Sequence, residues 1–479
     1  MKFHRLLLGP VVAALLSNCA RPSAGAETYD VVINHVNVVD VEAGRLRPDQ
    51  VVVVSHGKIV RVEPAGKHRY TARQTIDGSG RYLAPGLWDM HVHFRGGDGL
   101  AAANKKSLSL YLAHGITTVR DCGGDLTPSV MQWRRDEDAG RLAGPRIFTS
   151  GPKIDGPGAY WPGSLEVETP AQISKALDSL QQLRVDFVKI YDSKISGEAY
   201  LNTISQAEQR GMKTTGHMPY SVTLGEAVNR GLDATEHLYY VFKACSGKED
   251  SLTALVRNSL KTPKPLGLFA LLPAVYDTYS PAAAARIFRL MAAHHTAAVP
   301  TLSIGKALAE LPENDHAHDS IRAYIDPKIQ ATYARRLASA RQQSPAAQAF
   351  GQKLEARFVT LVPLMQAAGV TLLAGSDSGA FNSFVYPGAS LHDELRLLVQ
   401  AGLTPAQALR AATVNGARFM GVADRTGTVA PGKDADLVLL AGNPLADITN
   451  VGKIDAVVAR GVVYPAPALA GLLRAIKNR

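Results

Sequence analysis

The sequence contains a His-x-His pair, His91 and His93, inside an apolar run. In a β-strand, side chains two residues apart point to the same side, so both imidazoles face one interior. Two imidazoles at the end of a buried strand are costly unless a partner satisfies them, and a divalent metal ion is such a partner. The pattern alone is too common to decide between a metal site and hydrogen-bonded core histidines.

Four further polar residues accompany apolar, strand-like runs. Lys189 lies within one of them, where an ammonium group is poorly solvated unless it extends to the strand end. His217 and His237 each end a run, and Asp377 directly follows one. Singly, a satisfied core histidine or a helix-capping aspartate explains each of these residues. Together, imidazole and carboxylate donors at several strand ends predict a metal site for zinc, manganese, iron or cobalt.

The elements that must position these residues alternate along the middle of the chain, from residue 83 to about 420. Eight strand-like runs are separated by segments of helical periodicity, and Thr169 and Thr404 each precede a proline and a glutamine that can close a capping box. The alternation predicts an α/β fold, a (β/α)8 TIM barrel with its site at the carboxyl ends of the strands. No glycine-rich dinucleotide loop follows the first run, which disfavours a doubly wound open sheet. The predicted strands are residues 87–94, 116–119, 146–150, 187–190, 214–217, 234–237, 297–302 and 371–374.

Two regions at opposite ends of the chain, 27–82 and 421–465, have short runs of β-branched residues separated by turns. Neither region has enough strands for a stable sheet alone, so we expect one composite β-sandwich built from both. Residues 83–420 then form the barrel, and residues 466–479 a C-terminal tail.

The polar set, with residues 115–121 and 432–437, resembles the amidohydrolase superfamily, in the binuclear-metal branch of imidazolonepropionase-like and prolidase-like enzymes. The resemblance extends from Tyr29 to Tyr464. It implies two divalent metal ions, zinc in the first place, with manganese, cobalt or iron as alternatives. By residue, it implies His91, His93 and Asp377 at the first metal, His217 and His237 at the second, and between them Lys189 as a carbamate formed with carbon dioxide.

The same resemblance implies hydrolysis, in which a hydroxide between the metals attacks a carbonyl and Asp377 moves the proton. The leading expectation is an amide bond of a small peptide or an N-acyl amino acid. A cyclic amide, a lactone or an ester is the alternative for the same centre. A non-catalytic exported metal-binding protein is the alternative from another class, although such a protein does not need Asp377.

Substrate contacts are expected from loops that follow the strands. The loop 151–169 is long enough to be functional and carries Tyr160 and Trp161, but it lacks the histidine of dipeptidase-like relatives. Arginines at this face can grip a carboxylate with two hydrogen bonds. The candidate substrate-binding residues are Arg95, Arg120, Tyr160, Trp161, Tyr191, Tyr220 and His392.

The N-terminus predicts export. Residues 1–26 combine a basic start with a short apolar core, which is typical of a cleaved signal peptide; a lipid anchor at Cys19 is the alternative. We therefore expect a periplasmic or secreted protein, or an envelope lipoprotein. The net charge of +10 is spread along the chain, which argues against nucleic acid as a partner. No later segment predicts a transmembrane helix, and the pairing of Cys122 with Cys245 and the formation of a homo-oligomer stay open.

Overall fold

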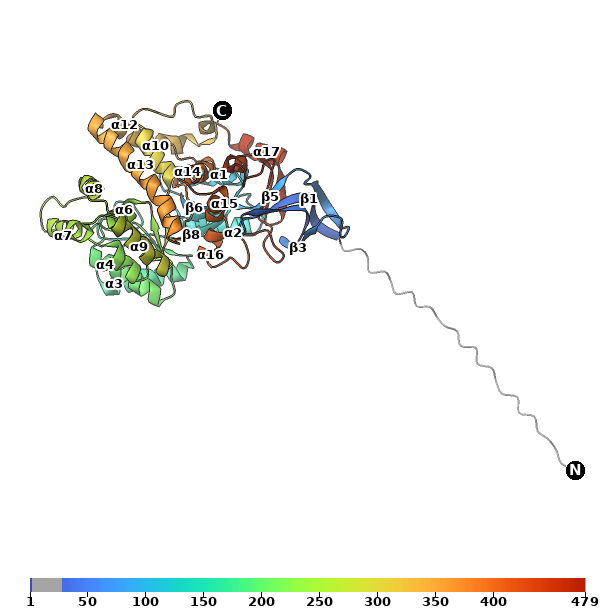
Figure 1. The fold of residues 1–479 in the computed structure, drawn as a ribbon, viewed down its shortest axis with the longest axis horizontal. Helices are drawn as coiled ribbons and strands as arrows, with labels where there is room; N and C mark the ends of the chain where they lie inside the picture. The colour runs from blue at the N-terminus through green and yellow to red at the C-terminus, as the bar shows by residue number, and fades with distance from the viewer. Residues whose placement is uncertain (2–27, 479) are drawn as a thin grey trace.

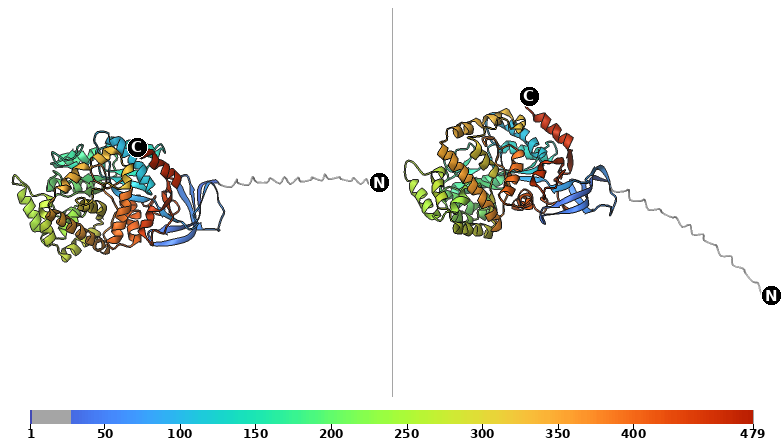
Figure 2. Two further views of the ribbon diagram at one scale, coloured as in Figure 1. Left: turned by 90° about the horizontal axis from the view of Figure 1, so that it is seen from above. Right: turned by 45° about the horizontal axis from the view of Figure 1, so that its top comes forward.

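The computed structural model describes Met1 and residues 28–478. The predicted signal peptide and Cys19 lie outside the described residues, apart from Met1. Figure 1 shows the N-terminal strands at one end of the molecule and a larger body of strands and helices beside them. Both views in Figure 2 show the same division. Within residues 28–478, none of the helices is long and apolar enough to cross a membrane.

Strands from both ends of the chain form one eight-stranded sheet, in the order β18-β17-β16-β5-β1-β2-β3, with β4 pairing with β1. The two ends meet where β16 pairs antiparallel with β5. Alternate residues of β2 pack on opposite sides: Val52 and Val54 belong to one apolar cluster, and Val51 and Val53 to another. The strands are β1 (Thr28–Asp40), β2 (Arg45–Ser55), β3 (Lys58–Pro64), β4 (Thr71–Asp77), β5 (Tyr82–Pro85), β16 (Leu437–Leu440), β17 (Ile454–Ala459) and β18 (Val462–Pro465).

The central strands form two parallel sheets, in the orders β15-β6-β7-β8 and β10-β9-β11-β12-β13-β14. Their short strands are almost wholly buried, as expected where helices cover a parallel sheet. The strands are β6 (Leu87–His93), β7 (Ile116–Asp121), β8 (Arg146–Thr149), β9 (Ile154–Asp155), β10 (Leu165–Glu166), β11 (Val188–Ile190), β12 (Thr214–Gly216), β13 (Ala234–Glu236), β14 (Ala297–Val299) and β15 (Ser378–Gly379).

Residues 371–374, predicted as the eighth strand, do not form a regular strand, so this prediction is corrected. It makes only an isolated bridge between Leu372 and Ala298, because the backbone of Ala374 donates to Ala411 at the end of a helix instead of to a strand. The segment nevertheless lies between β14 and β6. The amide of Ala298 donates to the carbonyl of Thr371 at 2.9 Å, and that of Met90 to the carbonyl of Ala374 at 2.8 Å.

Helices alternate with the central strands, and both predicted capping boxes form, at Thr169 with Gln172 and at Thr404 with Gln407. The predicted C-terminal tail contains a helix, α17, whose Leu469 packs against Leu112 of α1. The helices are α1 (Leu100–Ala113), α2 (Thr127–Asp138), α3 (Pro170–Leu183), α4 (Gly197–Gln209), α5 (Leu224–Asn229), α6 (Tyr239–Ala244), α7 (Glu249–Ser259), α8 (Leu268–Asp277), α9 (Pro281–Ala293), α10 (Leu302–Glu310), α11 (Pro327–Ala331), α12 (Ala334–Arg341), α13 (Pro345–Ala367), α14 (Ala389–Gln400), α15 (Pro405–Ala411), α16 (Val414–Phe419) and α17 (Ala466–Ile476), with short 3₁₀ turns η1 (Ser320–Tyr324) and η2 (Ile448–Gly452).

Candidate metal centre and active site

Three predicted ligands meet at the end of β6. His91 and His93 project from the same side of the strand, and their Nε2 atoms lie 3.1 Å apart. Oδ1 of Asp377 lies 2.8 Å from Nε2 of His93 and 3.4 Å from Nε2 of His91. One ligand atom from each of the three residues lies within 4.8 Å of the others, so the group can hold a metal ion.

Two more histidines extend this group. The ring centroid of His237 lies 5.0 Å from that of His91 and 5.0 Å from that of His217. Nδ1 of His217 donates to Asp192 at 3.2 Å, which leaves its Nε2 lone pair free. Nδ1 of His237 bonds to the hydroxyl of Thr301 at 2.7 Å. The four imidazoles therefore form a continuous row, in which Nδ1 of His91, His217 and His237 is held by a hydrogen bond and Nδ1 of His93 has no partner among the described residues.

The protonation of the row suits metal binding. Burial lowers the pKa of all four histidines, that of His91 to about 3, so the imidazoles are neutral at ordinary pH. Metals bind the neutral form of imidazole. Burial raises the pKa of Asp377 to about 7, against the opposing charges of Arg336 and Arg95.

Lys189 lies on β11, fully buried beside this row. Its Nζ has no hydrogen-bond partner among the described residues. An ammonium group in that position is desolvated and makes no hydrogen bond, which costs free energy, although the carboxyl groups of Glu236 and Asp377 are near enough to interact with its charge. A carbamate on Nζ would remove the positive charge and supply two oxygens, so the orphaned nitrogen fits the role that the sequence resemblance implies for Lys189.

The backbone at two of these residues is left-handed. Asp377 and His237 both have φ of 61°, a region that residues other than glycine, asparagine and aspartate seldom adopt. Each follows a run of the parallel sheet and donates its amide to a neighbouring segment: Asp377 to His91 at 2.7 Å, and His237 to Val299 at 2.9 Å. These hydrogen bonds hold both residues in the left-handed conformation.

A layer beneath the histidine row orients His91. Glu236 accepts a hydrogen bond from Nδ1 of His91 at 2.6 Å, and its second oxygen accepts from Arg120 at 2.6 Å and from the hydroxyl of Thr215. Although desolvation opposes ionisation, Arg120 and His91 lower the pKa of Glu236 well below its usual value. With Nδ1 protonated, His91 presents the lone pair of Nε2 to the centre.

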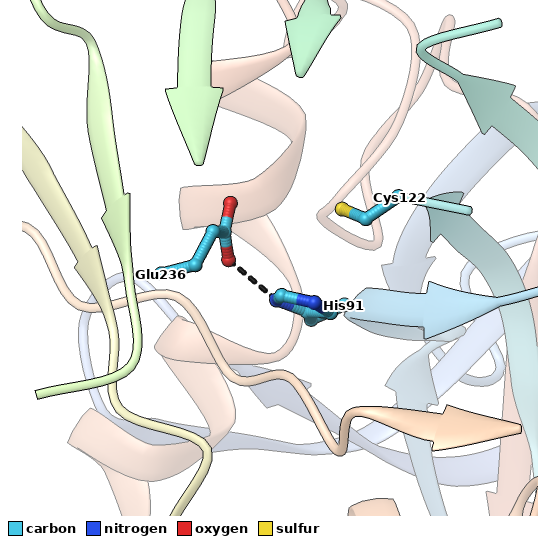
Figure 3. Close-up of side chains that lie close together, drawn as sticks. All are labelled: His91, Cys122 and Glu236. Carbon is cyan, nitrogen blue, oxygen red and sulfur yellow. Dashed lines mark hydrogen bonds and ion pairs between the residues drawn. The ribbon is translucent and has the colours of Figure 1, made fainter. Parts of the chain in front are cut away.

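Cys122 lies beside His91 and Glu236, and the three could also hold a metal by proximity. Figure 3 shows the bond between His91 and Glu236, with Cys122 joined to neither. Burial raises the pKa of Cys122 to about 12, so the thiol stays protonated and is a poor ligand. Like Cys245, it forms no disulfide. We interpret this group as support for His91 instead of a separate metal site.

A cavity of about 350 Å³ opens over the row. Arg95 stacks on the ring of Trp161, with 3.8 Å between its guanidinium carbon and the ring centroid. Nε and Nη1 of Arg95 make no hydrogen bond with the described residues, and Nη1 lies 3.7 Å from a carboxylate oxygen of Asp125. The predicted site residues that line the cavity are His93, Arg95, Trp161, Tyr191, His217, His237 and Asp377.

Arg120 and His392 were predicted to contact the substrate, but neither lines this cavity, so the prediction is corrected for both. Arg120 is fully buried below the histidine row, where it donates to Glu236 and to the carbonyl of Met90. His392 donates from Nε2 to the carbonyl of His114 at 2.8 Å, and burial lowers its pKa to about 3. Both side chains therefore bond to neighbouring groups of the protein and do not face the cavity.

The two tyrosines Tyr160 and Tyr220 also lie outside the cavity lining. Tyr160 is 55% exposed and packs edge-on against Trp161, while its hydroxyl accepts from Arg335 at 2.8 Å. Tyr220 is buried and donates to the carbonyl of Tyr239 at 3.2 Å. Direct substrate contact by these two tyrosines stays a prediction.

The comparison with protein families shows the family of this chain. The model of the amidohydrolase family matches residues 82–464. The chain belongs to the amidohydrolase family. The prediction of an amidohydrolase from the sequence is thereby confirmed.

Solved structures agree in fold with this amidohydrolase. A bottromycin amidohydrolase is 24% identical, with a TM-score of 0.71, covering 93% of this chain and 90% of that chain. A Xaa-Pro dipeptidase with methionine bound in its active site is 20% identical, with a TM-score of 0.67, covering 91% of this chain and 99% of that chain. Among curated proteins, the adenine deaminase of Chelativorans sp. (strain BNC1) is 32% identical over 108 residues, and the match spans only 22% of this chain and 18% of the deaminase.

Sequence reasoning missed several residues of this amidohydrolase site. Glu236 is the last residue of β13 and Asp192 follows the end of β11 by two residues, so their positions at strand ends offered a signal for both. Asn382, which donates to Oδ1 of Asp377 at 2.7 Å, follows an irregular turn and gave no signal. Arg336 and Glu355 line the cavity from α12 and α13, which are remote in sequence from the strand ends.

Glu236→Gln is expected to weaken metal binding by about 10- to 100-fold, because the amide no longer holds the proton on Nδ1 of His91 as firmly. Metal retained after equilibrium dialysis against buffered zinc measures this effect. Glu137→Gln is the matched control: Glu137 is a buried carboxylate paired with Arg460, away from the histidine row. Unchanged zinc affinity in the Glu236 variant would contradict the orienting role.

Proposed function

We propose that this amidohydrolase hydrolyses an amide bond of a small peptide or N-acyl amino acid with two divalent metal ions. The observation that carries the proposal is the row of four neutral histidines, with Asp377 and an orphaned Lys189, below a cavity with arginine donors. The family match supports this class of reaction, and the solved dipeptidase shares the fold.

The site residues have different roles in this proposal. His91, His93 and Asp377 would hold one metal, His217 and His237 the other, with Lys189 as a carbamate between them. Bound there, the metals supply Lewis-acid polarisation of a carbonyl and a lowered pKa for water.

Asp377 contributes the proton transfer in this proposal. Its carboxyl lines the cavity beside the imidazoles, so it can accept a proton from the attacking water and deliver it to the leaving nitrogen. Arg95, which stacks on Trp161 and lines the cavity, is placed to bind a substrate carboxylate.

We further propose that the two parallel sheets close into the (β/α)8 barrel. The hydrogen bonds of residues 371–374 to β14 and β6 support closure on one side. On the other, the amide of Asp186 donates to the carbonyl of Thr149 at 3.0 Å, which joins the start of β11 to β8. The sheet shared by both ends of the chain supports a composite β-sandwich over 27–82 and 421–465.

Purified protein supplied with zinc or manganese is expected to carry close to two divalent ions per chain, because five nitrogen and oxygen donors and Lys189 converge. Elemental analysis after gel filtration measures the stoichiometry. A chelator should abolish turnover and added metal should restore it. One ion per chain, unchanged in excess metal, would favour a mononuclear enzyme.

A substrate screen tests the reaction itself. Metal-loaded protein is offered dipeptides, N-acyl amino acids, cyclic amides and lactones. We expect turnover of linear amides that carry a free carboxylate. Turnover confined to lactones or cyclic amides would overturn the proposal in favour of the alternative reaction at the same centre.

A further inference from the structure

A second cavity, of about 460 Å³, adjoins the cavity over the histidine row. The two cavities meet at six shared wall residues, which we call the junction. The shared residues are Tyr239, Phe269, Gly305, Leu308, Arg336 and Glu355. Beyond this junction the second cavity is mainly apolar, with Leu272, Leu311, Phe350 and Leu354 in its wall.

Glu355 is the one carboxylate of the described residues at this junction. It lies on α13, and its carboxylate packs against Gly305 of α10, where a Cβ would collide with it. Glu355 forms no hydrogen bond or ion pair with any described residue, and burial raises its pKa to about 8. Arg336 shares the junction: its Nη2 donates to Asn382 at 3.3 Å, its Nη1 has no hydrogen-bond partner among the described residues, and it forms no ion pair with Glu355. The junction therefore offers a carboxyl group without a polar partner, which a bound cation would stabilise in its charged form.

The two cavities differ in the charged residues that line them. Arg95 and Trp161 line only the cavity over the histidine row, whereas Glu355 lines both cavities. A substrate whose carboxylate binds Arg95 places its amide near Asp377, and its acyl side then extends toward Glu355. An ammonium group there would compensate the desolvated carboxylate, and an apolar side chain would fill the second cavity.

We propose that Glu355 is a specificity-determining residue that binds the free α-amino group of a dipeptide, with an apolar N-terminal side chain in the second cavity. This assignment rests on the proposed function. Of the two substrate classes named there, it favours the dipeptide over the N-acyl amino acid. An N-acyl group has no cation for Glu355. The carboxyl group would then stay without a polar partner, and the affinity that a charge pair contributes would be lost.

The test compares leucyl-alanine with 4-methylpentanoyl-alanine, which is the same amide without the amino group. Metal-loaded wild-type protein is expected to cleave leucyl-alanine with a kcat/KM about 10- to 100-fold higher, the range of a hydrogen-bonded charge pair. Glu355→Gln should remove most of this difference by lowering kcat/KM for leucyl-alanine alone. Glycyl-alanine should be about 10-fold poorer than leucyl-alanine in the wild type, because the second cavity stays unfilled.

Gly305→Ala provides a second variant if Glu355→Gln folds poorly. Alanine is favourable within a helix, and its Cβ displaces the Glu355 carboxylate, so discrimination should again fall. Glu310→Gln is the control, since Glu310 is an exposed partner of Lys306 on the same helix and lines neither cavity. Equal use of both amides by wild type and Glu355→Gln would overturn the assignment while the proposed function stands. Cleavage of neither amide would contradict both.

Discussion

Asp377→Asn is expected to lower kcat by at least about 10²–10⁴-fold, the usual contribution of a general acid-base group. The asparagine side chain keeps the shape of the aspartate and can still contact Asn382, so the fold and part of the metal content should survive. It cannot accept the proton that the proposed role requires. Loss of a ligand charge beside His93 can deepen the effect further.

The measurement pairs kcat on a verified substrate with metal content and far-ultraviolet circular dichroism. Asp121→Asn is a matched control, because Asp121 is a buried carboxylate at the end of the neighbouring β7 and bonds to Thr149 without lining the cavity. Its turnover per folded, metal-loaded molecule should stay near that of the wild type. Near-normal turnover in Asp377→Asn would rule out the acid-base role.

Lys189→Ala is expected to lose both metal and turnover. The proposed carbamate supplies two oxygens and a negative charge that offset repulsion between two dications, and alanine supplies neither. Small carboxylic acids such as acetate or formate fit the space that the truncated side chain leaves, so they should partly restore metal binding and activity.

Metal content and rate are measured with and without added acetate. Lys243→Met is the control, because Lys243 is also buried but donates to the carbonyls of Tyr220 and Val222 outside the histidine row. That variant should lose stability and keep its metals. If Lys189→Ala retained two metals and full rate, Lys189 would be a structural lysine and the bridging carbamate would be wrong.

The sequence by itself determined the features that depend on short-range geometry. The period of two in a strand puts His91 and His93 on one side of β6, and an apolar run ending in a polar residue marks where a parallel strand ends. Capping boxes at Thr169 and Thr404 are likewise local, because the threonine and its glutamine are three residues apart. The family itself was predicted from a resemblance, carried by the polar residues together with residues 115–121 and 432–437.

Tertiary structure alone decided which polar groups share a cavity. Arg95 and Arg120 look alike in sequence, yet one lines the cavity and the other lies beneath the histidine row against Glu236. Residues 371–374 look like a strand, but competition from the end of α15 breaks their ladder. Glu355 reaches the site from α13, far along the chain from the strand ends. Such outcomes depend on long-range packing, which sets burial and partners and which no local pattern encodes.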